Sequence, residues 1–446
     1  MRTYCKNVDI LDMDLIKRGI WDALSGKLNR DNYASYIATF GVHTGKQVKR
    51  LAKDLKYGVI DSGAFHKEFE KDVDLVAAEV HRQFSNKKLE LGEVRYEERF
   101  DKGTRKWRML GIETPIHQII EHIAVLALDE LWKKKLCYHQ YSSISGKGQA
   151  KGSRAIRKWA KQGTIQYFVK GDIRKCFDNI GHEDVMKLLR RDIGKNRDLL
   201  WLIEELLKYH NSPTAKPGRG LLVGSWLSSM LCNYMLSYAY RHVIELCRMR
   251  RGKRNHYVRH ALFFMDDMLL TATNRKDLKS GIRELSAFLN ERFSLEIKPN
   301  WHVKDFSKEP ITMMGFTVFF NGDIKIRRQN FLNIRRSYIT IDSGKFDIKD
   351  CRTCSAYHGN FKGTQTQKVW DLPDGRRINI PVLQKKASHF QSDFERKRRL
   401  EYAESCKLRR NAAADNNRIQ GQPEGCVVTH ERRGSHRRRR KQDVRL

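Results

Sequence analysis

Hydrophobic residues recur at every third or fourth position in several long stretches of the chain, a spacing that predicts amphipathic helices. The first two stretches cover residues 32–55 and 64–84. A third follows Pro115 over residues 116–136, where the apolar stripe is expected to pack against a core. The same spacing predicts a helix over residues 153–162, a helix pair over 182–210, and helices over 225–248 and 278–293.

Other segments have the composition of strands. Residues 165–169 (IQYFV) are rich in β-formers, and residues 260–273 (HALFFMDDMLLTAT) form two apolar runs separated by Met265-Asp266-Asp267. The second pattern predicts a hairpin with acidic residues at its tip. A further hairpin is expected over residues 311–328, with its turn at Asn321-Gly322. The charged segment 95–106 (RYEERFDKGTRK) predicts either a hairpin or a flexible loop.

Composition and charge narrow the classes of partner. At 446 residues the chain is expected to form two or three packed subdomains with tails, and 40% hydrophobic residues can build a sizeable core. The formal net charge of +35 favours a polyanionic partner, nucleic acid first, although membrane binding or merely solvated charge would give the same balance. From about Arg396 the chain is basic and poor in apolar residues, which predicts either solvated disorder or a segment that contacts nucleic acid.

Several other functions are not favoured. Residues 1–15 lack the pattern of a secretory signal, and no run approaches the ~18 apolar residues of a membrane span, so we expect a cytoplasmic protein without a membrane partner. Nine scattered cysteines fit reduced thiols. Cys351 and Cys354 have a C-x-x-C spacing with His358 nearby, but no second pair follows at zinc-finger spacing. Glycines at 146, 148 and 152 lack the spacing of a P-loop.

Three aspartates carry the candidate chemistry. Asp172 follows the strand predicted at 165–169, and Asp266 and Asp267 lie at the predicted hairpin tip. Semi-buried acids are costly unless a cation pairs with them. Two Mg²⁺ ions ~3.5–4 Å apart, held by such carboxylates, would stabilise the attacking and leaving oxygens of a phosphoryl transfer. A lone Asp-Asp pair in a solvated turn is the alternative interpretation.

The motifs around these acids resemble bacterial reverse transcriptases. Residues 172–180 (DIRKCFDNI) resemble the first catalytic palm motif, and residues 264–267 (FMDD) resemble the aromatic-x-Asp-Asp motif. Between them, residues 220–233 (GLLVGSWLSSMLCN) resemble the template-gripping motif, in the expected order. Residues 106–112 (KWRMLGI) are similar to the fingers segment that contacts triphosphate, and residues 314–316 (MGF) to the primer-grip hairpin. The resemblance covers roughly residues 90–330.

The resemblance implies a role for each matching residue. The implied catalytic and metal-binding residues are Asp172, Asp266, Asp267 and the backbone carbonyl of Ile173. The implied deoxynucleotide-binding residues are Lys106, Arg108, Phe177 and Lys298. Phe177 would exclude a 2′-hydroxyl, and Lys298 would assist the departure of pyrophosphate. The implied template and primer contacts are Gly224, Ser225, Trp226, Ser228, Asn233, Met314, Gly315 and Phe316.

The resemblance also implies a fold and an activity. The expected fold is an α+β right-hand polymerase with fingers, a palm built on an antiparallel sheet, and a helical thumb. We expect a helical N-terminal region over residues 1–90, fingers and palm over 91–330, a thumb-like region over 331–395, and a basic, flexible tail over 396–446. The implied activity is RNA-directed DNA polymerisation from deoxynucleotides, with two Mg²⁺ ions, or Mn²⁺ in their place.

Departures from the family pattern bear on the subtype. Val223 stands where many relatives have Gln, and Trp226 and Ser229 stand where prolines are usual, which disfavours a mobile-intron enzyme. These residues, and residues 355–362 (SAYHGNFK), are closer to stand-alone enzymes of phage defence and of diversity-generating retroelements. Phage defence with a dedicated structured noncoding RNA is the preferred interpretation. A retroelement enzyme, untemplated or protein-primed DNA synthesis, and a non-catalytic, maturase-like RNA-binding scaffold are the alternatives, and the oligomeric state is left open.

Overall fold

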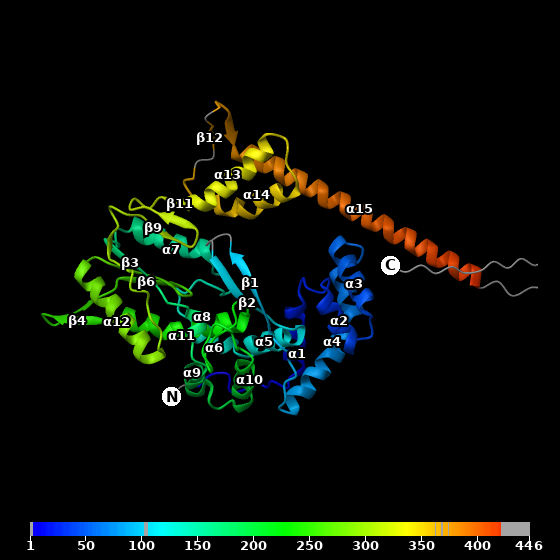
Figure 1. Cartoon of the computed structure of the whole chain (residues 1–446), viewed down its shortest axis with the longest axis horizontal. Coiled ribbons are helices and arrows are strands. Elements are labelled where there is room, and N and C mark those ends of the chain that lie inside the picture. The colour runs from blue at the N-terminus through cyan, green and yellow to red at the C-terminus, as the bar shows by residue number, and fades with distance from the viewer. Residues whose placement is uncertain (1–2, 102–105, 362, 367–368, 373, 421–446) are drawn as a thin grey trace, which may run out of the picture. The chain divides into compact units, whose positions relative to one another are not determined.

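The computed structural model describes residues 3–101, 106–361, 363–366, 369–372 and 374–420. Its contacts divide the chain into two compact units, Met1–Glu395 and Arg396–Leu446. The first unit holds the sheets and most of the helices (Figure 1). Of the second unit, the structure describes the continuation of one long helix, α15 (Ile380–Gln420).

Four helices form the N-terminal part of the first unit. They are α1 (Met13–Leu24), α2 (Asp31–Phe40), α3 (Gly45–Tyr57) and α4 (Ser62–Ser85). Polar caps fix two of their starts: Asp12 accepts from the backbone N–H of Asp14, and Thr44 forms a capping box with Gln47. Helix α1 packs closely on α5 (Pro115–Ala127) because Gly19 has no side chain; a Cβ there would come within 2.3 Å of Ile123.

A long antiparallel hairpin follows the N-terminal helices. Its strands are β1 (Arg95–Asp101) and β2 (Lys106–Ile112), paired from Arg95 opposite Ile112 to Asp101 opposite Lys106. Of the two structures expected for residues 95–106, the hairpin is therefore the one observed, and it extends six residues further than that segment. The turn itself lies outside the described residues.

The central sheet has four antiparallel strands in the order β6-β7-β3-β8. They are β3 (Tyr167–Asp172), β6 (His260–Phe264), β7 (Asp267–Ala272) and the short β8 (Lys304–Asp305). The expected hairpin over residues 260–273 is thus confirmed as β6 and β7. Strand β7 lies between its hairpin partner and β3, which is almost a hundred residues earlier in the chain.

The two faces of this sheet enter different cores. Val169, Phe263 and Leu270 pack into the large cluster that includes helices α11 (Trp226–Glu245) and α12 (Arg275–Phe293). Neighbouring Phe168 and Leu269 pack with α7 (Gln149–Lys161) and with the strands within residues 311–326. Since successive side chains of a strand point to opposite faces, this division follows from the sequence alternation. Both faces are covered, which explains why the strand segments are apolar almost throughout.

The helices around the sheet largely follow the expected stretches. Their bounds are α5 (Pro115–Ala127), α6 (Asp129–Lys135), α7 (Gln149–Lys161), α8 (Cys176–Asn179), α9 (His182–Ile193), α10 (Arg197–Lys208), α11 (Trp226–Glu245) and α12 (Arg275–Phe293). The single helix predicted over 116–136 breaks at Leu128, where the Trp132 indole N–H donates to the carbonyl of Val125 over 2.9 Å. The indole N–H thus takes the place of the backbone N–H that would bond to this carbonyl in a continuous helix.

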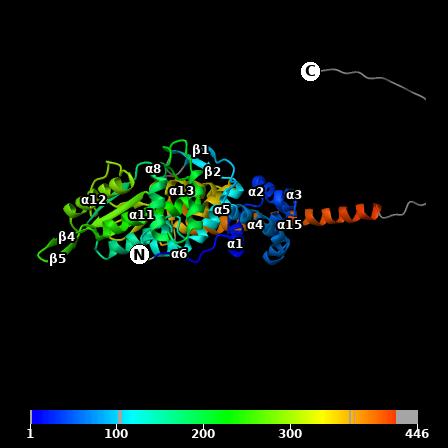
Figure 2. The same cartoon turned by 90° about the horizontal axis from the view of Figure 1, so that it is seen from below.

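Strands also replace the end of another predicted helix. Helix α11 stops at Glu245, and the chain continues into the hairpin of β4 (Cys247–Arg250) and β5 (Lys253–His256). Figures 1 and 2 both show this hairpin projecting from the body beside α12. The exposed side chains of β5 give no alternation that would predict a strand.

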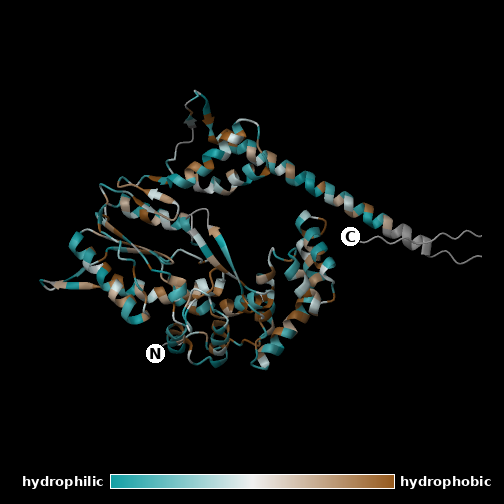
Figure 3. Cartoon of the chain, in the orientation of Figure 1, coloured by the Kyte–Doolittle hydropathy of each residue, from teal (hydrophilic) through white to brown (hydrophobic). Residues whose placement is uncertain are grey.

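The remainder of the first unit is a small sheet followed by a helical region. Strands β9 (Ile311–Met313), β10 (Phe316–Val318) and β11 (Ile324–Ile326) form two successive hairpins, of which the second is the one expected to turn at Asn321-Gly322. The later elements are α13 (Arg328–Asp342), α14 (Ile348–Phe361), β12 (Val369–Asp371), β13 (Arg377–Asn379) and α15. Hydrophilic residues predominate along α15 (Figure 3).

The C-x-x-C pair lies within this last region. Cys351 and Cys354 are buried on α14 in an apolar cluster with Tyr338 and Trp370. Burial raises the pKa of Cys354 to about 12, so its thiol stays protonated. Within the described ranges the pair belongs to no cluster of metal-ligating side chains. The packing explains both cysteines as small core residues.

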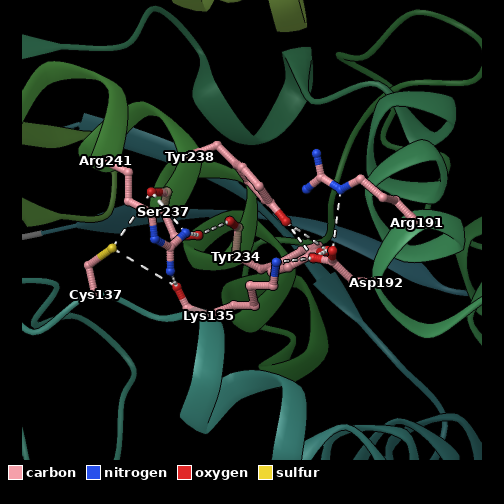
Figure 4. Close-up of polar contacts among 8 residues, drawn as sticks. All are labelled: Lys135, Cys137, Arg191, Asp192, Tyr234, Ser237, Tyr238 and Arg241. Carbon is pink, nitrogen blue, oxygen red and sulfur yellow. Dashed lines mark hydrogen bonds and ion pairs between the residues drawn. The ribbon is translucent and has the colours of Figure 1, made fainter. Parts of the chain in front are cut away.

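A buried carboxylate joins three segments beneath the sheet. Asp192, at the end of α9, accepts from the hydroxyls of Tyr234 at 2.7 Å and Tyr238 at 2.5 Å, and pairs with Lys135 at 2.9 Å (Figure 4). Burial would raise the pKa of Asp192, but these hydrogen bonds and Lys135 hold it below its ordinary value.

The same network continues along α11. Arg241 donates to the Ser237 hydroxyl at 3.0 Å and to the carbonyl of Lys135, while the Cys137 thiol contacts the carbonyl of Ser237 at 3.6 Å (Figure 4). Arg191 adds a second cation beside Asp192, with Nε 3.3 Å from Oδ1. The network therefore fixes α11 against α9 and against the segment after α6.

Candidate active site

The backbone brings the three aspartates to one end of the central sheet. Asp172, the last residue of β3, lies directly opposite Asp267, the first residue of β7. Asp266 occupies the turn of the β6–β7 hairpin beside Met265, which has a left-handed φ of 58°. The backbone N–H of Ile173 donates to the carbonyl of Asp266 over 3.3 Å. Two distant segments thus present their acids side by side.

Burial and mutual repulsion make Asp266 and Asp267 weaker acids than usual. Desolvation first, and then the charges of Asp267 and Asp172, raise the pKa of Asp266 to about 6. Desolvation also raises the pKa of Asp267, although the nearby cations Lys170, Lys298 and Arg327 partly offset it. A site that crowds carboxylates in this way lacks positive charge, which a bound cation would supply.

Lys298 reaches the acids from the segment that follows α12. Its backbone N–H donates to the carbonyl of Asp172 over 2.9 Å, and its ammonium lies 2.5 Å from Asp172 Oδ1. The neighbouring Arg174 N–H donates to Glu296, which holds this segment along the end of β3. The lysine singled out in the sequence therefore lies within the acidic cluster rather than on an unrelated surface.

A cavity of ≈ 440 Å³ opens in front of the carboxylates. Its walls come from β2, from the segment after β3, from the loop before α11 and from the β6–β7 turn. The lining residues are Glu98, Trp107, Arg108, Met109, Asp172, Ile173, Lys175, Cys176, Phe177, Asp178, Thr214, Val223, Asp266 and Lys298. Asp172 and Asp266, but not Asp267, thus line the same space as Arg108 and Phe177. The side chain of Lys106 lies outside the described residues.

The segment after β3 positions Phe177 by local bonds. Lys175 takes a left-handed φ of 43° at the start of the short helix α8, and the carbonyl of Phe177 accepts from the N–H of Leu221 over 2.8 Å. Asp178 accepts from the Thr214 hydroxyl over 3.0 Å. Phe177 is half-buried, so one part of its ring packs on the core while another lines the cavity.

The loop before α11 is held against the hairpin formed by β1 and β2. Gly224 has a φ of 114°, which strongly favours glycine, and the carbonyl of Val223 accepts from the N–H of Gly111 over 3.3 Å. The side chains of Ser225, Ser228 and Asn233 are buried and bond within the protein. Ser225 caps α11, Ser228 accepts from Leu222 N–H, and Asn233 donates to Ser142. Ser225 and Ser228 therefore shape the loop, whereas Asn233 joins α11 to the segment that contains Ser142. Trp226 is partly exposed and packs against His122.

The expected primer-grip residues form the turn between β9 and β10. Met314 and Gly315 have φ values of 55° and 81°, and Gly315 accepts from the N–H of Arg327. The Met314 and Phe316 side chains are buried, and Met314 packs so closely on Gly152 that a Cβ there would lie 2.5 Å from its sulfur. Of the glycines noted in the sequence, Gly152 thus serves close packing, whereas Gly146 and Gly148 have open space around them and left-handed φ values of 71° and 105°. Only the backbone of this turn remains to face a ligand.

Comparison with known proteins agrees with this architecture. Residues 100–318 match the family model described as "Reverse transcriptase (RNA-dependent DNA polymerase)". The chain therefore contains a reverse transcriptase domain, and its mixed helical and antiparallel architecture is that of a right-hand polymerase, as expected from the sequence motifs.

The relatives are distant. The chain is 22% identical over 302 residues to the group II intron-encoded protein LtrA of Lactococcus lactis, which covers 53% of this chain and 47% of that protein. It is 25% identical over 178 residues to a Pol polyprotein of the type-1 retrotransposable element R2 of Nasonia vitripennis, covering 36% and 16%. The chain spans less than half the length of the curated relatives it matches. A telomerase structure from Candida albicans aligns with a TM-score of 0.38 at 12% identity, covering 64% of this chain and 57% of the other.

The structure adds one observation on membranes. Among the helices in the described residues, none combines the length and the apolar character that a bilayer crossing requires.

Proposed function

We propose that the chain is an RNA-directed DNA polymerase that adds deoxynucleotides to a primer by two-metal phosphoryl transfer. The observation that carries this proposal is the pairing of Asp172 with Asp267 across β3 and β7, with Asp266 in the adjoining turn and facing the same cavity. Two metal ions held by such carboxylates also serve nucleases and phosphatases, so the family match of residues 100–318 is what favours polymerisation over hydrolysis. In polymerisation the ions would offset the negative charge that develops on two oxygens at once.

The donor set fits magnesium. Carboxylate and carbonyl oxygens are hard ligands, and Asp172, Asp266, Asp267 and the backbone carbonyl of Ile173 would hold the ions, with Mn²⁺ as an alternative. The pKa of Asp266, raised by burial first and then by the neighbouring negative charges, supports this assignment, since a bound cation would stabilise the ionised carboxylate. When bound, two such ions supply charge stabilisation for the attacking 3′-oxygen and the leaving pyrophosphate.

The substrate triphosphate would lie between the carboxylates and β2. Arg108 lines the cavity and offers a forked set of donors to phosphate oxygens, and Lys106 begins the same strand. Phe177 would lie under the sugar, where a 2′-hydroxyl would clash with its ring. Lys298, already beside Asp172, is placed to give a proton or charge to the leaving pyrophosphate.

Template and primer would follow the two loops described above. The buried Ser225 and Ser228 would act by holding the backbone of Gly224 and Trp226 in place for the template, and the buried Asn233 by holding α11 against Ser142, rather than by contacting the template. The turn at Met314-Gly315-Phe316 would support the primer end through its backbone. A net charge of +35 supplies the positive potential that a nucleic-acid duplex needs.

We further propose a dedicated structured noncoding RNA as the partner, in a cytoplasmic antiphage role. The support comes from the motif around Val223 and from residues 355–362, which resemble stand-alone defence enzymes, and from the strongly basic composition. Cysteines that remain thiols, including Cys176 and Cys232 with sulfur atoms 3.9 Å apart, fit a reducing compartment.

The test is polymerisation by the purified chain, followed by sequencing of its product. Labelled deoxynucleotides and Mg²⁺ are supplied with a primed RNA, and separately with the RNA that co-purifies with the protein. Incorporation whose sequence changes with the RNA supports the proposal. Product independent of any RNA would instead indicate untemplated or protein-primed synthesis, and tight RNA binding without incorporation would indicate a scaffold. A variable-gene repeat as the bound RNA would point to a retroelement enzyme.

A further inference from the structure

Four ionisable side chains meet in the interior beside the end of β2. None of them lines the cavity in front of Asp172 and Asp266. They are Glu113, which follows β2, His117 and Glu121 on α5, and His210, which follows α10. Each is at most 6% exposed, and one potential ligand atom from each lies within 4.8 Å of the others. The sequence does not reveal this cluster, because the one-turn spacing of His117 and Glu121 is its only feature within a single segment.

The separations within the cluster are close to those around a small metal ion. His210 Nε2 lies 3.1 Å and His117 Nε2 lies 3.8 Å from the same oxygen of Glu121. A tetrahedral zinc ion with bonds of ~2.0–2.1 Å separates its ligand atoms by about 3.3 Å. Side-chain rotations that shift these atoms by about an ångström would therefore close the four groups around one ion.

Several polar atoms in the cluster have no partner within the described part of the chain. These are both ring nitrogens of His117, Nδ1 of His210 and Oε1 of Glu113. An unsatisfied buried polar group costs about 1–3 kcal/mol, and proteins rarely leave several of them together. The 3.8 Å separation of His117 from Glu121 is too long for a hydrogen bond. An ion held between the four groups would supply the missing partner for one ring nitrogen of His117 and for Oε1 of Glu113.

The charges lead to the same conclusion. The positive charge of Lys27 acts to lower the pKa of Glu113, but the Lys27 ammonium donates its hydrogen bond to Gln118, over 2.8 Å. Burial first, and then the neighbouring carboxyl of Glu121, raise the pKa of Glu113, and burial lowers the pKa of both histidines. Two buried carboxylates and two neutral imidazoles would be balanced in charge by one dication.

We propose that Glu113, His117, Glu121 and His210 bind one divalent transition-metal ion, with Zn²⁺ the best match. Two imidazoles and two carboxylates suit zinc, whereas Mg²⁺ prefers a shell made of oxygen ligands alone. Four protein ligands in a buried site leave no open position for a substrate, so the ion has a structural role. Ser225 supports the site by donating to the second oxygen of Glu121 over 2.6 Å.

The position of the site gives the ion a specific task. It would join the end of β2 to α5 and to the end of α10, and through Ser225 it would reach the loop that carries Gly224. That loop is already bonded to Gly111 of β2. The ion would thus fix the strand that carries Arg108 relative to the palm. This inference does not depend on the proposed polymerase activity.

The test begins with the unmodified full-length protein. It is equilibrated with Zn²⁺, dialysed against metal-free buffer, and analysed for metal by mass spectrometry; about one zinc per chain is expected. Replacement by Co²⁺ should give the visible absorption of a tetrahedral nitrogen and oxygen site, and X-ray absorption should show two imidazole ligands. Stripping the ion should lower the melting temperature by several degrees. Absence of retained zinc, or a retained ion without imidazole ligands, would overturn the inference.

Variants then locate the ion. His117→Ala and Glu121→Gln should lose the retained zinc, whereas His122→Gln should keep it, because His122 on the same helix is bonded to Asp22 at 2.8 Å. Asp172→Asn combined with Asp266→Asn should also keep it, which separates this site from the acidic cluster. Zinc retained by folded His117→Ala and Glu121→Gln proteins would overturn the assignment. If those variants do not fold, the imidazole signature of the unmodified protein decides the question.

Discussion

The ammonium of Lys298 lies 2.5 Å from Oδ1 of Asp172, so the lysine occupies the carboxylate that is proposed to bind magnesium. Ion and lysine therefore compete for the same oxygen. We expect Lys298→Met to reach half-maximal polymerisation at a lower Mg²⁺ concentration than the unmodified protein, while its maximal rate falls because the leaving pyrophosphate loses a cation. Initial rates across a magnesium titration measure both quantities. An unchanged magnesium requirement would show that the contact is not competitive.

Asp266→Asn should remove polymerisation and leave RNA affinity almost unchanged. The substitution keeps the size of the side chain but removes a charge that the metal ions need, and it touches no phosphate contact. We expect a rate loss on the order of a hundredfold to a thousandfold. Primer extension and RNA binding are measured on the same preparation. Asp305→Asn, on the half-buried edge strand β8, is the matched control and should extend primers normally. An active Asp266→Asn protein would refute the site.

Phe177→Ala should admit ribonucleotides. The ring lines the cavity beside Asp172, and removing it opens the space that a 2′-hydroxyl would occupy. The ratio of kcat/KM for dNTP over rNTP should fall by at least about tenfold. Because the ring is half-buried, the melting temperature is measured as well. A lower melting temperature with unchanged sugar selectivity would show that Phe177 is only a core residue.

Removing residues 396–446 should weaken the salt dependence of RNA binding. The deleted segment includes the continuous cationic run at residues 437–441. Each lost phosphate contact lowers the slope of log K against log salt by about 0.7–0.9. Binding is measured by titration at several salt concentrations, with the polymerisation rate at low salt as a check on folding. An equal slope in both proteins would show that the segment makes no contact with RNA.

Asp192→Asn should destabilise the protein at neutral pH. The buried carboxylate accepts bonds from Tyr234 and Tyr238 and pairs with Lys135, so losing its charge should cost about 2–4 kcal/mol. Because the pKa of Asp192 is lowered on folding, its contribution is present above the unfolded value near pH 4 and is lost as the pH falls through the folded value. The stability difference between the two proteins should therefore shrink in acid.

Denaturant unfolding at pH 7 and below pH 4 measures this effect. Tyr234→Phe serves as the comparison, because it removes one bond to Asp192 and leaves the pair with Lys135 intact; its cost should be nearer 1 kcal/mol. A difference between Asp192→Asn and the unmodified protein that does not change with pH would contradict the assignment of the charge.

The sequence predicts the strands and the hairpin that carry the acidic residues, but not how those strands pair. The β6–β7 hairpin follows from two apolar runs around Asp266 and Asp267, and β3 follows from residues 165–169. Their pairing in register is not visible in either segment, because it depends on contacts between distant strands. The motif resemblance, rather than periodicity, anticipated that Asp172 would join the pair.

Other features give no local signal. Strand β8 is only two residues long, and β5 is exposed throughout, so neither shows an alternating pattern. The break at Leu128 depends on the hydrogen bond that the indole N–H of Trp132 donates to Val125. The buried cluster that contains Glu113 and His210 forms only because segments about a hundred residues apart meet in the interior. Such features arise from tertiary packing, which local propensity does not encode.

The long separation between Asp172 and its partner strand has a consequence for synthesis of the protein. A nascent chain that has emerged only as far as α11 holds the first carboxylate without β7, and Lys298 and β8 follow later still. The chain would therefore acquire catalytic competence only after β7 has paired with β3 and the segment that carries Lys298 has emerged. Before that moment a partly made chain could attract RNA through its positive charge but could not extend a primer.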